Sequence, residues 1–142
     1  RSWIEFCNNI SLYTFQLSIK ESENEFKDTL ELMLNDFDLV ENCLEDPPFF
    51  NGKQFSLVDS SYAPVLQRLD FLEQIYKPII TPERYPKLAK WKDNLMLLKA
   101  VKDSAVDDIQ AIYYKLLWTR QGYISQFLNE KEYGKRPTKS TY

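Results

Sequence analysis

The side chains in this sequence that could do chemistry are few, and Arg68 is the most distinctive of them. It interrupts an apolar stretch, PVLQRLDFL, which covers residues 64–72. An arginine is hard to bury without a partner carboxylate, and its planar fork of N–H donors suits carboxylate or carbonyl oxygens. From the residues alone, a salt bridge to Asp70, to Glu73 or to an acid of the preceding helix is the favoured interpretation.

The sequence contains few side chains that could act as a nucleophile or as a general acid or base. The chain has no histidine and two cysteines, Cys7 and Cys43, so the usual general base and the commonest zinc ligand are missing. Only a thiolate attacks, and Cys7 shares an apolar stripe with Phe6 and Ile10; a small core residue is favoured, with pocket lining as the alternative. We interpret both cysteines as buried thiols of a cytoplasmic protein, with a disulfide or a reactive thiol as the alternative. No catalytic residue, metal ligand or cofactor site is predicted.

Aromatic and acidic residues are plentiful but not specific. Trp3, Tyr114 and Trp118 could stack on an apolar electrophile, although packing in the core or at an interface is the favoured role for each. The acids between residues 36 and 46 are predicted to form a solvated face, because a catalytic pair needs two acids in one pocket.

Length and composition bound the class of protein. The 142 residues are 44% apolar and 15% aromatic with a net charge of −3, which predicts one packed domain. An acidic balance argues against nucleic acid as a partner, and no apolar run is long enough to cross a membrane. The chain shows no signal peptide and begins with Arg1, from which we expect an isolated domain, a processed product or a fragment of something larger.

Helical periodicity dominates the sequence and predicts an all-α fold of five or six helices. Apolar stripes indicate helices over about 2–20, over 26–44 and from 56 to 76. A fourth helix follows Pro86, and the apolar stripe of the last helix begins at Ile109 and is interrupted by Gly122.

The third of these predicted helices has the clearest start. Ser56 and Asp59 have the spacing of a capping box, in which each side chain accepts a hydrogen bond from the other residue's backbone N–H. Pro64 lies inside the same helix and predicts a kink, because its ring clashes with the carbonyl of Ser60.

Three segments resemble the C-terminal half of cytosolic glutathione transferases. "FFNGKQFSLVDSSYAPVLQRLDFLE" is similar to the segment that opens the sixth helix of that family, "RYPKLAKWKDNL" to the next helix in bacterial and omega-like members, and "RSWIEF" to the start of the fourth helix. The segments occur in the family's order and spacing. The resemblance implies an all-α transferase-like domain over residues 1–129, followed by a tail over 130–142 that we predict to be mobile.

The resemblance also implies a function. In the family this all-α half supplies one wall of the electrophile pocket and much of a homodimer interface, while a thioredoxin-like N-terminal domain binds glutathione, the co-substrate used in detoxification. Omega-like members have a similar Pro-x-x-x-Arg-Leu segment whose arginine faces the substrate pocket, so Arg68 is a candidate to orient an anionic or carbonyl-bearing substrate. The family's N-terminal domain has no counterpart in the 142 residues, and the chain by itself is predicted to be inactive.

A second interpretation is a non-catalytic assembly module. Similar all-α domains serve in this way on some aminoacyl-tRNA synthetases and on elongation factor one gamma. The sequence upstream of Arg1 would separate the two interpretations.

Overall fold

The computed structural model describes residues 3–45, 48–102 and 106–134. Within these ranges the chain forms helices connected by loops, and its β-structure is limited to one isolated bridge between Phe49 and Gly52. The helices are α1 (Trp3–Ile19), α2 (Glu23–Cys43), α3 (Leu57–Ile75), α4 (Pro86–Lys102), α5 (Val106–Arg120), the 3₁₀ helix η1 (Tyr123–Phe127) and α6 (Glu130–Tyr133). The predicted all-α class with five or six helices is confirmed.

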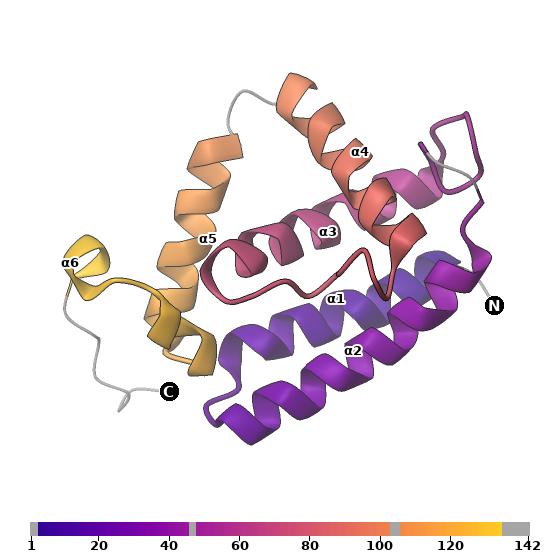
Figure 1. Ribbon diagram of the computed structural model, residues 1–142. Coiled ribbons are helices and arrows are strands. Elements are labelled where there is room, and N and C mark those ends of the chain that lie inside the picture. The colour runs from indigo at the N-terminus through magenta and orange to yellow at the C-terminus, as the bar shows by residue number, and fades with distance from the viewer. Residues whose placement is uncertain (1–2, 46–47, 103–105, 135–142) are drawn as a thin grey trace.

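The helices are arranged around α1 and α3 (Figure 1). α1 and α2 lie side by side as a long hairpin, and α3 packs along α1. α4 packs against α3 and α2, whereas α5 packs against α1 at the other end of the molecule. α4 and α5 therefore diverge, and the cavity described below is lined by α1, α3 and α5.

The core follows the predicted apolar stripes. The central positions of α3, Leu66, Leu69 and Leu72, are fully buried, as are Phe26 and Phe37 of α2. Burial of side chains of this size is the main source of stability in such a domain. No helix in the described part of the chain is long and apolar enough to span a membrane.

The N-terminus of α3 is organised by the buried carboxylate of Asp59, which is fully inaccessible to solvent. Ser56 and Asp59 form a capping box: the backbone N–H of Ser56 donates to Oδ2 of Asp59 at 2.7 Å, and the Ser56 hydroxyl donates to the same oxygen at 2.9 Å. The other oxygen, Oδ1, accepts the N–H of Phe50 and the indole N–H of Trp91, both at 2.8 Å. One carboxylate thus joins the α2–α3 loop, α3 and α4. We call these four residues the Asp59 node.

The free backbone N–H groups at the start of α4 are also hydrogen-bonded by a side chain from another helix. The carboxylate of Glu41 on α2 accepts the backbone N–H groups of Lys87 (3.1 Å) and Leu88 (2.8 Å) at the start of α4. These are among the amides that a helix cannot satisfy internally. α3 continues without a break through Pro64, whose side chain is exposed.

The last predicted helix is interrupted at Gly122, as expected. α5 stops at Arg120, and Gln121 adopts a left-handed conformation with φ of 54°. A Cβ on Gly122 would lie 2.7 Å from the carbonyl oxygen of Ser18, so only glycine lets this segment approach the end of α1 so closely. The N–H of Tyr123 then donates to the carbonyl of Lys20 at 2.6 Å.

The segment predicted to be a mobile tail begins with the helical turn α6. Its Tyr133 ring lies 6.0 Å from the ring of Trp118 on α5. Residues 135–142 of that predicted tail lie outside the described part of the chain.

Candidate functional site

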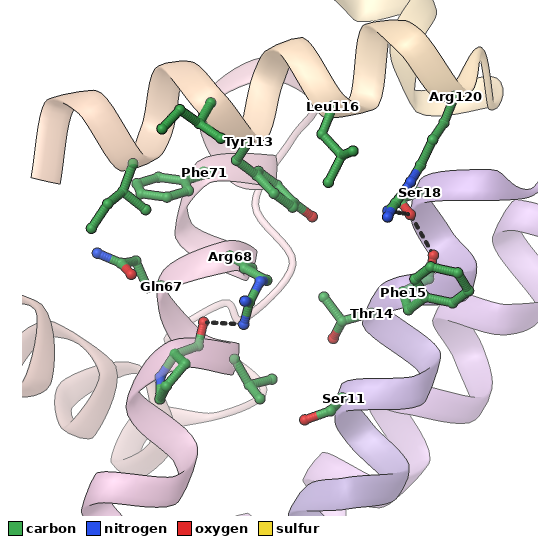
Figure 2. Close-up of a pocket in the computed structure, with 14 residues that line it drawn as sticks. Ser11, Thr14, Phe15, Ser18, Gln67, Arg68, Phe71, Tyr113, Leu116 and Arg120 are labelled. Carbon is green, nitrogen blue, oxygen red and sulfur yellow. Dashed lines mark hydrogen bonds between the residues drawn. The ribbon is translucent and has the colours of Figure 1, made fainter.

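A cavity of about 480 Å³ lies between α1, α3 and α5 (Figure 2). Its volume falls within the range of small-molecule sites in proteins. Each helix contributes residues spaced three or four positions apart, which places them on one face of that helix. The lining residues are Ser11, Thr14, Phe15 and Ser18 from α1, Pro64, Val65, Gln67, Arg68 and Phe71 from α3, and Ile109, Ile112, Tyr113, Leu116 and Arg120 from α5.

Arg68 lies at this cavity and is exposed (Figure 2). One terminal nitrogen of its guanidinium donates to the carbonyl of Pro64 at 3.4 Å, a long hydrogen bond within its own helix. Asp70 and Glu73, the acids expected to pair with it, instead form ion pairs with Lys92 of α4. The favoured salt bridge is therefore wrong for these two acids, because the side chains of Asp70 and Glu73 extend to the α4 side of α3, away from Arg68.

Arg120 is a second cation at the cavity, and sequence reasoning missed it. Its guanidinium donates to the hydroxyl oxygen of Ser18 at 2.7 Å and lies 4.8 Å from the centre of the Phe15 ring. These contacts hold the end of α5 against α1. The only signal in the sequence was its spacing: Arg120 falls on the same helical face as Tyr113 and Leu116.

Tyr113 is a third polar group at the cavity that the sequence did not single out. Its side chain is 8% exposed, and its hydroxyl has no hydrogen-bond partner among the described residues. In Figure 2 this hydroxyl points into the space between Arg68 and Arg120. Burial raises the pKa of Tyr113 to about 12, although the two nearby arginines act to lower it. The phenol therefore keeps its proton and remains a donor at neutral pH.

Comparisons with known proteins bear on what this cavity is. The family model described as "Glutathione S-transferase, C-terminal domain" matches residues 23–93, which is half of the chain. The chain belongs to this family. The match runs from the start of α2 through α3 into α4, and so includes the Asp59 node and Arg68 but not α5.

Two curated relatives agree with this glutathione S-transferase assignment. A "Probable glutathione S-transferase" of Glycine max is 28% identical over 107 residues, covering 68% of this chain and 44% of the relative. "Glutathione S-transferase L3" of Arabidopsis thaliana is 44% identical over 62 residues, covering 41% of this chain and 26% of the relative. The matched regions thus span less than half the length of either relative. No solved structure matches the chain significantly, and the likeness to bacterial and omega-like members stays a prediction.

Two of the predicted pocket residues of this glutathione S-transferase domain lie at the start of α1, outside the cavity. Cys7 is buried; its thiol donates to the carbonyl of Ser61 at 3.3 Å, and burial raises its pKa. The Trp3 ring packs 5.4 Å from Phe6 and 5.6 Å from Phe50. Cys7 contacts α3 and Trp3 contacts the loop before it, and both lie one turn or more ahead of Ser11, the first residue of α1 that lines the cavity. Cys43, predicted to be buried, is exposed at the last position of α2.

The other two predicted pocket residues are on α5 and also lie away from the cavity. The Tyr114 hydroxyl donates to the carbonyl of Phe71 at 2.6 Å and accepts from the Gln110 amide at 3.1 Å. Trp118 is 4% exposed and packs beside Tyr133. One residue along a helix turns the side chain by about 100°, so Tyr113 lines the cavity while Tyr114 does not. Of the five predicted pocket residues, only Arg68 lies at it.

Proposed function

We propose that this chain is the substrate-binding and dimerisation domain of a glutathione S-transferase-like protein. In this proposal the cavity between α1, α3 and α5 forms one wall of the electrophile site. The observation that carries it is a cavity of ligand size, about 480 Å³, within a domain of this family. A thioredoxin-like domain outside the 142 residues would supply the glutathione site, and the whole protein would act in the cytoplasm on toxic electrophiles.

A binding experiment on the purified chain tests the pocket. We expect N-phenyl-1-naphthylamine, a neutral apolar fluorophore, to bind at micromolar to millimolar concentration with enhanced emission, because apolar ligands gain from burial in such a cavity. Leu116→Asp, which puts a charge on the apolar wall, should abolish that binding. An absence of probe binding to the unchanged chain would favour the assembly-module interpretation instead.

Glutathione itself should not bind to this chain appreciably. The family activates the thiol with residues of its N-terminal domain, and the chain offers no histidine as a substitute base. Calorimetry with glutathione checks this expectation. Micromolar affinity would show a thiol site within these residues, and would contradict the division of labour proposed here.

The dimerisation role is supported by apolar side chains exposed on the α1–α2 hairpin. Leu12 is 53% exposed, Leu32 51% and Leu39 52%. Leu32 and Leu39 are seven positions apart and so share one face of α2, and apolar side chains that gather on one face mark protein–protein interfaces. We expect sedimentation to give a dimer that Leu32→Glu dissociates. Leu97→Glu on α4 is the matched control, since Leu97 is 66% exposed and lies outside this hairpin.

A further inference from the structure

We propose that the cavity selects molecules that combine an apolar body with a single anionic oxygen group, such as a carboxylate, and that Arg68, Arg120 and Tyr113 bind this group together. This inference rests on the proposed function, in which the cavity holds a small molecule. It narrows the anionic or carbonyl-bearing substrate that the resemblance implies for Arg68 to an anion with an apolar body, and it adds two residues, Arg120 and Tyr113, that would determine this preference.

The charge of the cavity lining is the first support. The chain as a whole is acidic, with 21 acidic and 18 basic residues. The lining nevertheless contains two arginines and neither aspartate nor glutamate. Among the described residues neither Arg68 nor Arg120 takes part in an ion pair. The cavity therefore carries two positive charges without an internal counterion, which favours an anion in the ligand.

The donors at the cavity are the second support. A guanidinium has five N–H donors, and the hydrogen bonds found in the described structure use one on Arg68 and one on Arg120. The buried Tyr113 hydroxyl has no partner there either, and it points between the two arginines (Figure 2). Leaving a buried hydroxyl unsatisfied is unfavourable. A carboxylate oxygen between these groups would accept from all three residues.

The apolar remainder of the cavity is the third support. Phe71, Ile109, Ile112 and Leu116 lie on the α3 and α5 walls, and Phe15 is held under the Arg120 guanidinium. Such walls bind a ring system or a chain by burial rather than by hydrogen bonds. A fully polar anion such as phosphate would leave this surface unused, so the apolar body is part of the proposed specificity.

A pair of fluorescent probes tests the anion directly. 8-Anilinonaphthalene-1-sulfonate and N-phenyl-1-naphthylamine share one ring system, but only the first carries an anionic group. Because charge-assisted hydrogen bonds are strong, we expect the anion to bind about tenfold more tightly to the unchanged chain. Naphthalene-1-carboxylate should displace it, whereas naphthalene-1-methanol should do so only at about tenfold higher concentration.

Variants then assign the effect to residues. Arg68→Gln should weaken binding of the anionic probe about fivefold to tenfold, and Tyr113→Phe about threefold, while the neutral probe binds as before. Arg120→Gln also removes the contacts with Ser18 and Phe15, so its effect is measured as the ratio of the two probe affinities, which should fall about fivefold to tenfold. Lys115→Gln is the matched control, because it removes a positive charge from an exposed site on α5 and should change neither probe. Thermal melts of each variant establish that it is folded.

The outcomes separate the two proposals. Equal affinity for the two probes, or an anion preference that both arginine variants retain, overturns the anion specificity and leaves the proposed pocket intact. Failure of both probes to bind overturns the pocket itself. Loss of anion preference in the arginine variants, with the neutral probe unaffected by Arg68→Gln, supports the inference.

Discussion

The Asp59 node and the cavity differ in how fully their polar groups are hydrogen-bonded. At the node, one buried carboxylate accepts four hydrogen bonds from three residues, and each of those donors comes from the chain itself. At the cavity, Tyr113 and two arginines retain donors that the described chain does not use. Both regions include residues of α3: the node lies at its N-terminus, and the cavity is lined by its residues from Pro64 to Phe71. Polar groups whose hydrogen bonds are all made within the chain stabilise this fold. Polar groups with unused donors are the ones that we propose bind a ligand.

The largest effect is expected from Asp59→Ala. It would leave the N–H groups of Ser56, Phe50 and Trp91 without their acceptor, each at a cost of about 1–3 kcal/mol. We expect a loss of about 3–5 kcal/mol of unfolding free energy, measured by urea denaturation. Ser56→Ala should cost less, about 0.5–2 kcal/mol, because its backbone N–H still donates to the Asp59 carboxylate.

Asp28→Ala, at an exposed position on α2, is the control. Equal stability of the Asp59 and Asp28 variants would show that the node does not organise the fold.

Gly122→Ala tests the contact between the end of α5 and the end of α1, two helices that line the cavity. The added Cβ would lie 2.7 Å from the backbone oxygen of Ser18, and backbone cannot yield as a flexible side chain can. We expect a destabilisation of about 1–3 kcal/mol together with weaker binding of the naphthylamine probe. Gln126→Ala, exposed in η1, serves as control. A variant as stable as the original would mean that α5 can shift away from α1 at no cost.

Alkaline pH should weaken the fold through its buried phenols. Burial raises the pKa of Tyr113 to about 12 and raises those of Tyr62 and Tyr85 as well, whereas an unfolded tyrosine titrates near pH 10. Above about pH 10 the unfolded state therefore binds fewer protons than the folded state, and stability falls as pH rises, by up to about 1.4 kcal/mol per pH unit for each such tyrosine.

Urea denaturation at several pH values above about pH 9 measures that slope. Tyr113→Phe should make this slope shallower by up to about 1.4 kcal/mol per pH unit, which corresponds to one proton. A slope identical in the variant and the original would mean that Tyr113 titrates in the folded protein as it does in the unfolded chain.

The smallest effects are expected from two adjacent tyrosines, Tyr113 and Tyr114. Only the hydroxyl of Tyr114 has a hydrogen-bond partner in the described structure, so the two variants compare a partnered hydroxyl with an unpartnered one. Tyr114→Phe removes a hydroxyl that donates to Phe71 and should cost about 0.5–1.5 kcal/mol. Tyr113→Phe removes a hydroxyl without a partner in the described structure and should be neutral or stabilising by up to about 1 kcal/mol. Thermal and urea melts at neutral pH compare them. A larger loss from Tyr113→Phe than from Tyr114→Phe would contradict the view that its hydroxyl is held open for a ligand.

The sequence predicted the node better than the cavity, and the reason is physical. Ser56 and Asp59 interact across one helical turn, so their spacing alone carries the information. Even there, the sequence did not reveal that Asp59 also accepts from Trp91, which lies 32 positions further on. Helix positions were predictable for the same reason, because apolar periodicity is local.

The cavity depends on how α5 packs against α1 and α3, which no local pattern specifies. Arg68 could be found because a charge interrupts an apolar stripe. Tyr113 and Arg120 look like ordinary residues of an amphipathic helix, and their role appears only once the helix is oriented. The same limit explains why Tyr114 and Cys7 were plausible pocket residues that the packing directs elsewhere.

The hydrogen bond between Arg120 and Ser18 joins residues 102 positions apart, and that separation has a consequence for biosynthesis. Ribosomes add about 5–20 residues per second, so roughly 5–20 s pass between the synthesis of the first wall and that of the last. During this interval Phe15, and in its second half also Phe71, lie on a nascent chain that has no α5 to pack against them. Exposed apolar surface of this kind is what chaperones bind and what aggregates form around. The apolar wall of the cavity in the finished protein is thus first an unprotected surface during translation.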